Sequence, residues 1–111
     1  MQVLGKNQTN NFPPAIHAAY APTFGIRAGD EVTFKVRTFR TTAGSETWDF
    51  GDGSPKVEVQ SDGNANPLGK DGYAMTQHTY AKAGSYIARV ERSNERGEAA
   101  VARLVIEVLA P

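Results

Sequence analysis

Apolar and polar residues alternate along most of this chain in short runs. After Glu31, the apolar residues Val32, Phe34 and Val36 occupy every second position, with polar or charged residues between them. A period of two places successive side chains on opposite faces of a β-strand. Nowhere does the apolar spacing keep a helical period over three turns. The pattern predicts strands at residues 16–20, 31–37, 46–50, 56–60, 73–80, 86–91 and 98–109.

Turn-forming residues separate these predicted strands. Glycine, aspartate, asparagine and proline gather at residues 28–30, 51–55 and 61–72, and these residue types favour turns and surface loops. About seven short strands joined in this way are typical of an all-β sandwich with two antiparallel sheets. We expect residues 1–14 to be a flexible lead-in and residues 15–111 to form the sandwich domain. A polar start and an end just after a strand are expected of a domain excised from a longer protein.

The composition excludes several classes of function. The 111 residues carry 12 Lys and Arg against 12 Asp and Glu, and this neutral balance argues against nucleic-acid binding. There is no cysteine, so disulfides, thiolate metal sites and thiol nucleophiles are excluded. No stretch is apolar for long enough to span a bilayer, so membrane insertion is not expected.

Two aromatic residues occupy positions that immunoglobulin-like sandwiches use. Trp48 is the only tryptophan and lies on the third predicted strand, where such folds often bury a tryptophan. Tyr86 opens the next-to-last strand two residues before Ala88, which is the spacing of a tyrosine corner. Antibody domains carry a disulfide cysteine at the position of Ala88, so here apolar packing is expected to join the sheets. The sequence therefore predicts an immunoglobulin-like β-sandwich.

Three short segments follow one another in a specific order. They read Trp48-Asp49-Phe50-Gly51-Asp52-Gly53-Ser54, then His78-Thr79-Tyr80, then Ala83-Gly84-Ser85-Tyr86-Ile87-Ala88-Arg89-Val90. In the type and order of these segments, the chain from Ala15 to Leu109 resembles the PKD (polycystic-kidney-disease) domain family. In that family WDFGDG ends the third strand, and HTY precedes the turn into a G-x-Y-x-V strand. The residues that carry the resemblance are Trp48, Asp49, Gly51, Asp52, Gly53, His78, Tyr80 and Tyr86.

The resemblance implies a PKD-type fold and a non-catalytic accessory function. Members of the family occur in extracellular and cell-surface proteins, often beside hydrolases, where they contact proteins or carbohydrates or separate other domains. We therefore expect a secreted or cell-surface location as part of a larger protein. The expected partners are neighbouring domains of that protein, and protein or polysaccharide, and the chain itself is expected to be a monomer. The alternative is a calcium-stabilised structural linker module.

Two features depart from the family pattern. Members place a short acidic turn before the tryptophan, whereas residues 42–47 read Thr-Ala-Gly-Ser-Glu-Thr. This difference weakens any transfer of calcium binding. The span between Ser54 and His78 is also longer than usual because of the loop at residues 61–72, which is expected to be a local elaboration such as a small extra hairpin.

The candidate calcium ligands are Asp49, Asp52 and Asp62. A metal site is one interpretation of Asp49 and Asp52, but the turn chemistry favours another, in which both carboxylates accept backbone N–H groups. The loop that begins at Asp62 copies the opening of an EF-hand. Pro67 then stands where that loop needs glycine, and Tyr73 where it needs a bidentate glutamate. We expect no cofactor, and calcium remains the candidate to test.

No catalytic residue is expected. His17 and His78 are the only histidines, too few for a structural zinc site without cysteine. Ser54 lacks the G-x-S-x-G spacing of a nucleophile elbow. A triad of a serine with His78 and Asp49 can be drawn on paper, but nothing in the spacing favours it. His78 is expected to form a structural hydrogen bond, and the chain is not expected to be an enzyme.

Two further sets of residues are candidates for surface contacts. The charged set is Arg89, Glu91, Arg103 and Glu107, for which we expect cross-strand charge pairing, with a polar binding face as the alternative. The aromatic set is Tyr20, Phe24, Phe39 and Tyr73. An exposed cluster of these rings would indicate sugar stacking or a protein contact.

Overall fold

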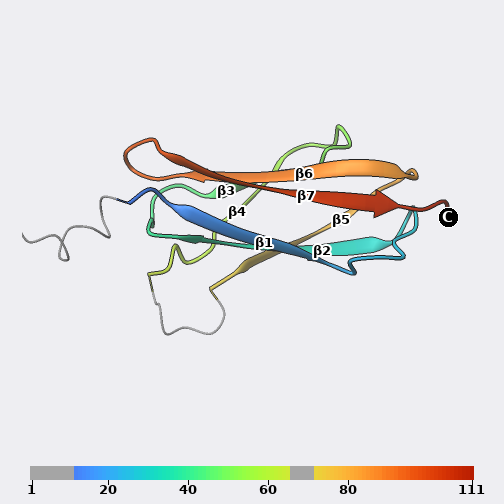
Figure 1. Ribbon diagram of the computed structural model, residues 1–111, viewed down its shortest axis with the longest axis horizontal. Helices are drawn as coiled ribbons and strands as arrows, with labels where there is room; N and C mark the ends of the chain where they lie inside the picture. Colours follow the sequence, from blue (N-terminus) through green and yellow to red (C-terminus); the bar gives the residue numbers. More distant parts are fainter. Residues whose placement is uncertain (1–11, 66–71) are drawn as a thin grey trace, which may run out of the picture.

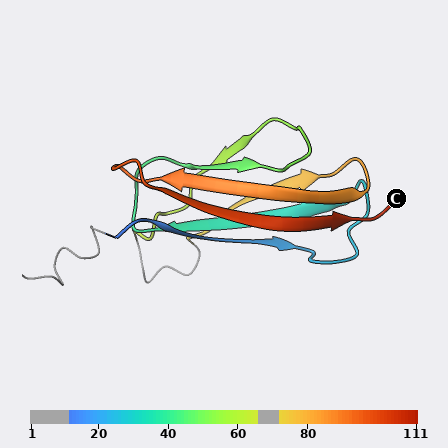
Figure 2. The same cartoon turned by 45° about the horizontal axis from the view of Figure 1, so that its top comes forward.

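A computed structural model describes residues 12–65 and 72–111, and these residues form a two-layered β-sandwich (Figure 1). The strands are β1 (Ala15–Ala21), β2 (Glu31–Phe39), β3 (Glu46–Asp49), β4 (Val57–Val59), β5 (Ala74–Thr79), β6 (Gly84–Ser93) and β7 (Ala99–Val108). One sheet has the order β1-β2-β5 and the other the order β4-β3-β6-β7. All neighbouring strands are antiparallel. The predicted fold class is therefore confirmed, and Figure 2 gives a second view of the same strands.

The strand positions agree with the alternation pattern, and the strand ends differ from it. The first strand lies at a sheet edge, where neighbouring prolines are tolerated. Strand β6 begins two residues earlier and ends two residues later than predicted, because backbone pairing with β7 continues from Gly84 opposite Val108 to Ser93 opposite Ala99. Backbone pairing with the neighbouring strand determines where a strand ends, and the alternation of side chains does not predict that position.

The core lies between the two sheets and is built from the inward positions that alternation predicts. On β7, the residues packed on the core are Ala102, Leu104, Ile106 and Val108. Phe34 of β2 and Trp48 of β3 are fully buried, with ring centroids 5.1 Å apart. Ala88 is also fully buried, so apolar packing joins the sheets where antibody domains have a disulfide. Trp48 therefore anchors the core from the four-stranded sheet.

The described chain enters and leaves the sandwich at opposite ends. Strand β1 begins toward one end of the sandwich, and the C terminus lies at the other end (Figures 1 and 2). Near the entry, the side chains of Arg96 and Arg40 donate hydrogen bonds to the carbonyl oxygens of Phe12 and Pro13, at 3.0 Å each. Residues 1–11 of the expected lead-in lie outside the described residues, as do residues 66–71 of the expected extra hairpin. The described part of the chain holds no helix that could cross a membrane.

Candidate functional site

The turn after β3 uses both of its aspartates to bind its own backbone. Asp49 Oδ1 accepts a hydrogen bond from the Gly51 N–H at 3.0 Å. Asp52 Oδ1 accepts the Ser54 N–H at 3.1 Å and the Ser54 hydroxyl at 2.5 Å. Gly51 and Gly53 have φ values of +84° and +82°, which favour glycine. The geometry is that of an Asx-type turn in which the carboxylates fix the loop.

His78 of β5 connects this turn to the other sheet. Its Nε2 lies 2.7 Å from Asp52 Oδ2, and its ring stacks on Phe50 with centroids 4.1 Å apart. Burial raises the pKa of the Asp52 carboxyl, but the hydrogen bonds from Ser54 and His78 outweigh it and hold the pKa below its ordinary value. Ser54 donates to Asp52 and His78 contacts the same carboxylate, so the carboxylate lies between the hydroxyl and the imidazole. This order differs from a Ser-His-Asp triad, in which the imidazole lies between the other two groups.

Two tyrosines complete the motif at this end of the sandwich. Tyr80 is fully buried, and its hydroxyl donates to the Phe50 carbonyl oxygen at 2.9 Å. Burial, together with the nearby Asp52 charge, raises the pKa of Tyr80 above its ordinary value, so the hydroxyl stays protonated and remains a donor. Tyr86 stacks on Tyr80 with centroids 4.4 Å apart and donates to the Lys82 carbonyl oxygen at 2.7 Å. That bond to the backbone four residues upstream has the geometry of a tyrosine corner.

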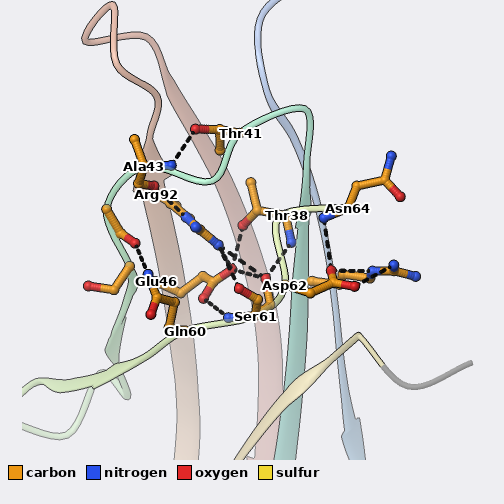
Figure 3. A network of polar contacts seen from close by, with 12 residues as sticks. Thr38, Thr41, Ala43, Glu46, Gln60, Ser61, Asp62, Asn64 and Arg92 are labelled. Atoms are coloured by element: carbon orange, nitrogen blue, oxygen red, sulfur yellow. Dashed lines mark hydrogen bonds and ion pairs between the residues drawn. The ribbon is translucent and has the colours of Figure 1, made fainter. Parts of the chain in front are cut away.

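A second polar cluster, which was not predicted, joins the two sheets (Figure 3). Glu46 of β3 is fully buried, and Arg92 of β6 is 1% exposed. Glu46 Oε2 accepts hydrogen bonds from Thr38 Oγ1 at 2.6 Å, Ser61 Oγ at 2.5 Å and Arg92 Nη1 at 3.0 Å. Its Oε1 accepts the Ser61 N–H at 2.8 Å. We call Thr38, Glu46, Ser61 and Arg92 the buried polar network.

The network holds Glu46 in its charged form. Burial by itself raises the pKa of this carboxyl, but the hydrogen bonds from Ser61, Thr38 and Arg92 outweigh burial and lower the pKa below its ordinary value. A sequence signal for the network did exist. Glu46 shares a strand face with Trp48 in the predicted strand 46–50. Arg92 continues the face of Val90, one residue beyond the predicted strand 86–91.

Asp62 has different hydrogen-bond partners from the other two candidate calcium ligands. Arg37 Nε and Nη2 donate to its two carboxylate oxygens at 3.0 and 2.9 Å, and its Oδ1 also accepts the Asn64 N–H at 2.8 Å. The hydrogen bonds from Arg37 hold the pKa of Asp62 below its ordinary value. Asp49 and Asp52 are instead bonded within the turn after β3. In the described ranges, no three His, Asp or Glu side chains are grouped so that they could hold a metal ion.

The charged surface set does not pair as expected. Arg89 forms its ion pair with Glu91 on the same strand, and the residue opposite it on β7 is Arg103. The expected cross-strand pairing of opposite charges is therefore wrong at this position, because the register places two arginines opposite each other.

The four aromatic candidates are separated from one another. Tyr20 packs against the core, and Phe24 is 85% exposed in the loop before β2. Lys35 Nζ lies 4.7 Å from the Tyr73 ring centroid, and the Arg37 guanidinium covers the Phe39 ring at 5.3 Å. In the part of the chain that the structure describes, no two of these four rings are in contact.

Comparison with known proteins decides the family. Residues 16–107 match the family model of the PKD domain. The chain belongs to this family. The turn after β3, the HTY segment and the Tyr86 corner are thus the parts of this PKD domain that carried the resemblance. No curated protein sequence gives a significant match to the chain.

Solved structures share the fold of this PKD domain at low sequence identity. A structure described as the basis for the promiscuous specificity of carbohydrate-binding modules from the β-sandwich superfamily has a TM-score of 0.70 and 17% identity, and the match covers 90% of this chain and 36% of that chain. The PKD domain of an M14-like peptidase from a Thermoplasmatales archaeon has a TM-score of 0.63 and 18% identity, covering 88% of this chain and 97% of that one. The PKD1 domain of Vibrio anguillarum Epp has a TM-score of 0.61 and 16% identity, covering 90% and 98%. The chain thus spans about a third of the first of these structures and nearly all of the other two.

Proposed function

We propose that this PKD domain is a non-catalytic accessory module of a larger secreted or cell-surface protein. In this function it holds neighbouring domains apart and presents its outer surfaces to protein or polysaccharide. PKD domains are generally non-catalytic, and the fold neighbours include both a peptidase-associated PKD domain and carbohydrate-binding modules.

The observation that carries the proposal is the position of the chain ends. The described chain enters at one end of the sandwich and leaves at the other (Figure 1). Strands β6 and β7 have ten residues each, and a ten-residue strand spans about 33 Å. Domains joined to the two ends would therefore be held about one strand length apart by a paired, antiparallel scaffold.

The motif chemistry supports a structural use of the residues that looked reactive. Asp49 binds a backbone N–H, and Asp52 binds both Ser54 and His78. The two motif tyrosines each donate to a carbonyl oxygen. These groups form contacts inside the fold, and such contacts stabilise a domain that acts as a spacer.

A double-labelled fusion tests the spacer function. The module is placed between two rigid reporter domains, each with one spin label on an introduced cysteine, which is unambiguous because the chain has no cysteine of its own. Electron–electron double resonance is expected to give a distance distribution that is narrower than that of a flexible linker, even with the flexible lead-in expected at residues 1–14. The control is a Gly/Ser linker of the same length, which behaves as a flexible coil and gives a broad distribution. A distribution as broad as that of the control would contradict the spacer function.

A further inference from the structure

Two exposed apolar side chains lie directly opposite each other on the outer face of the four-stranded sheet. Ile87 of β6 pairs with Val105 of β7, and each is 56% exposed. Single exposed apolar residues are ordinary on protein surfaces. A cross-strand pair of them forms a continuous small patch. Strands β6 and β7 run side by side along the molecule in both views (Figures 1 and 2).

Charged residues lie on both sides of this patch, with opposite signs. Two residues along the strands in one direction, Arg89 lies opposite Arg103. Two residues in the other direction, Ser85 lies opposite Glu107. Like charges directly opposite each other on a sheet are destabilising. Arg89 is compensated by Glu91. Arg103 forms no hydrogen bond or ion pair within residues 12–65 and 72–111.

The outer face of β7 is therefore self-complementary in charge. Arg103, Val105 and Glu107 follow at alternate positions, so a positive, an apolar and a negative side chain are evenly spaced along one face. A two-fold axis that lies across the strands at Val105 would turn a second copy end for end. Each Arg103 would then face the Glu107 of the other copy, with the apolar pairs at the centre. Such an isologous contact closes as a dimer.

We infer that the outer face of β6 and β7 binds a second copy of this chain in this antiparallel arrangement. The dimer replaces the monomer expected from the sequence. The formal net charge of zero leaves no long-range repulsion between the copies. Ten residues of two strands cover about 33 Å by 10 Å. The contact therefore buries about half, or less, of the roughly 800 Å² per partner that a standard interface buries. The dimer is accordingly weak, with a dissociation constant in the high micromolar to millimolar range.

Sedimentation velocity from about 10 μM to about 1 mM tests the dimer by charge exchange. The parent chain is expected to sediment faster as its concentration rises. Arg103→Glu places a negative charge against each Glu107 of the other copy. Because an attraction across the contact becomes a repulsion, the variant is expected to associate at least about tenfold more weakly. The double variant Arg103→Glu with Glu107→Arg exchanges the two ends of the pattern and is expected to restore association.

The controls separate the interface from folding. Lys35→Glu reverses one charge on β2, in the other sheet, and is expected to leave association unchanged. Thermal unfolding of each variant checks that it is folded. A parent chain that stays monomeric to about 1 mM would overturn the inference. So would an Arg103→Glu variant that associates like the parent, or a double variant that does not recover.

Discussion

At the scale of single residues, the turn after β3 contains one glycine that is constrained both by its backbone conformation and by a neighbouring strand. Gly51 and Gly53 both have positive φ. A Cβ on Gly51 would also lie 2.3 Å from the Ile87 carbonyl oxygen, whereas a Cβ on Gly53 would meet nothing within 4 Å. The alternation pattern and the turn residues could predict the turn itself. They could not predict the close approach of Ile87, because its strand lies more than thirty residues downstream.

Gly51→Ala is expected to destabilise the domain by at least about 3 kcal/mol, because it adds a backbone clash to the strain of positive φ. Gly53→Ala is the matched control and is expected to cost about 1–2 kcal/mol, the strain alone. Urea unfolding of the two variants measures the difference. Equal losses would show that the approach of Ile87 imposes no constraint.

Trp48→Ala is expected to cost about 3–5 kcal/mol, as large-to-small aromatic changes in cores do. Trp48 is fully buried between Phe34 and Phe50, so its removal leaves a cavity that backbone-fixed strands cannot close. Thermal or urea unfolding measures the loss. A variant as stable as the parent would refute the assignment of Trp48 as the core anchor.

At the scale of elements, the buried polar network ties three strands to the segment after β4. Thr38, Glu46 and Arg92 belong to β2, β3 and β6, and Ser61 follows β4. Sequence reasoning located these strands but expected only apolar residues inside. A charged pair that is satisfied by hydrogen bonds can occupy inward positions, and its partners are 8 to 46 residues apart. The alternation of apolar and polar residues along one strand cannot predict contacts between residues so far apart in the sequence.

Arg92→Met is expected to cost about 3–5 kcal/mol, because it leaves the Glu46 carboxylate buried without its cation. The control is Arg89→Ala, which breaks an ion pair whose side chains are both 40% exposed and is expected to cost less than about 1 kcal/mol. Urea unfolding at neutral pH compares the two. If the losses were equal, the network would contribute no more than a surface ion pair.

At the scale of the whole molecule, acidic side chains stabilise the fold in their charged forms. The pKa values of Glu46, Asp52, Asp62 and Glu98 are all lowered, from ordinary values of 4.5 for glutamate and 3.8 for aspartate. A lowered folded-state pKa contributes stability that is present above the unfolded-state pKa and lost as pH falls through the folded value. The sandwich followed from alternation and the family motifs, whereas the sheet order and this charge pattern depend on tertiary contacts.

Stability is therefore expected to be flat from about pH 7 to pH 5 and to fall steadily below about pH 4.5, the range in which these carboxyls take up protons. Glu46→Gln removes one of the titrating groups, so the variant starts from a lower stability at neutral pH and loses less of it on acidification. Urea unfolding at a series of pH values measures both slopes. A parent chain equally stable at pH 3 and pH 7 would contradict the lowered pKa values.

We expect the motif carboxylates to stabilise the fold and to bind no metal ion. Calorimetric unfolding in calcium and in chelator, for the parent and for Asp52→Asn, tests it most directly, since an ion bound only by the folded state raises the melting temperature. We predict the same melting temperature for the parent in both conditions, and an equal decrease for Asp52→Asn in both. A melting temperature that rises with calcium in the parent, and no longer rises in Asp52→Asn, would contradict the account.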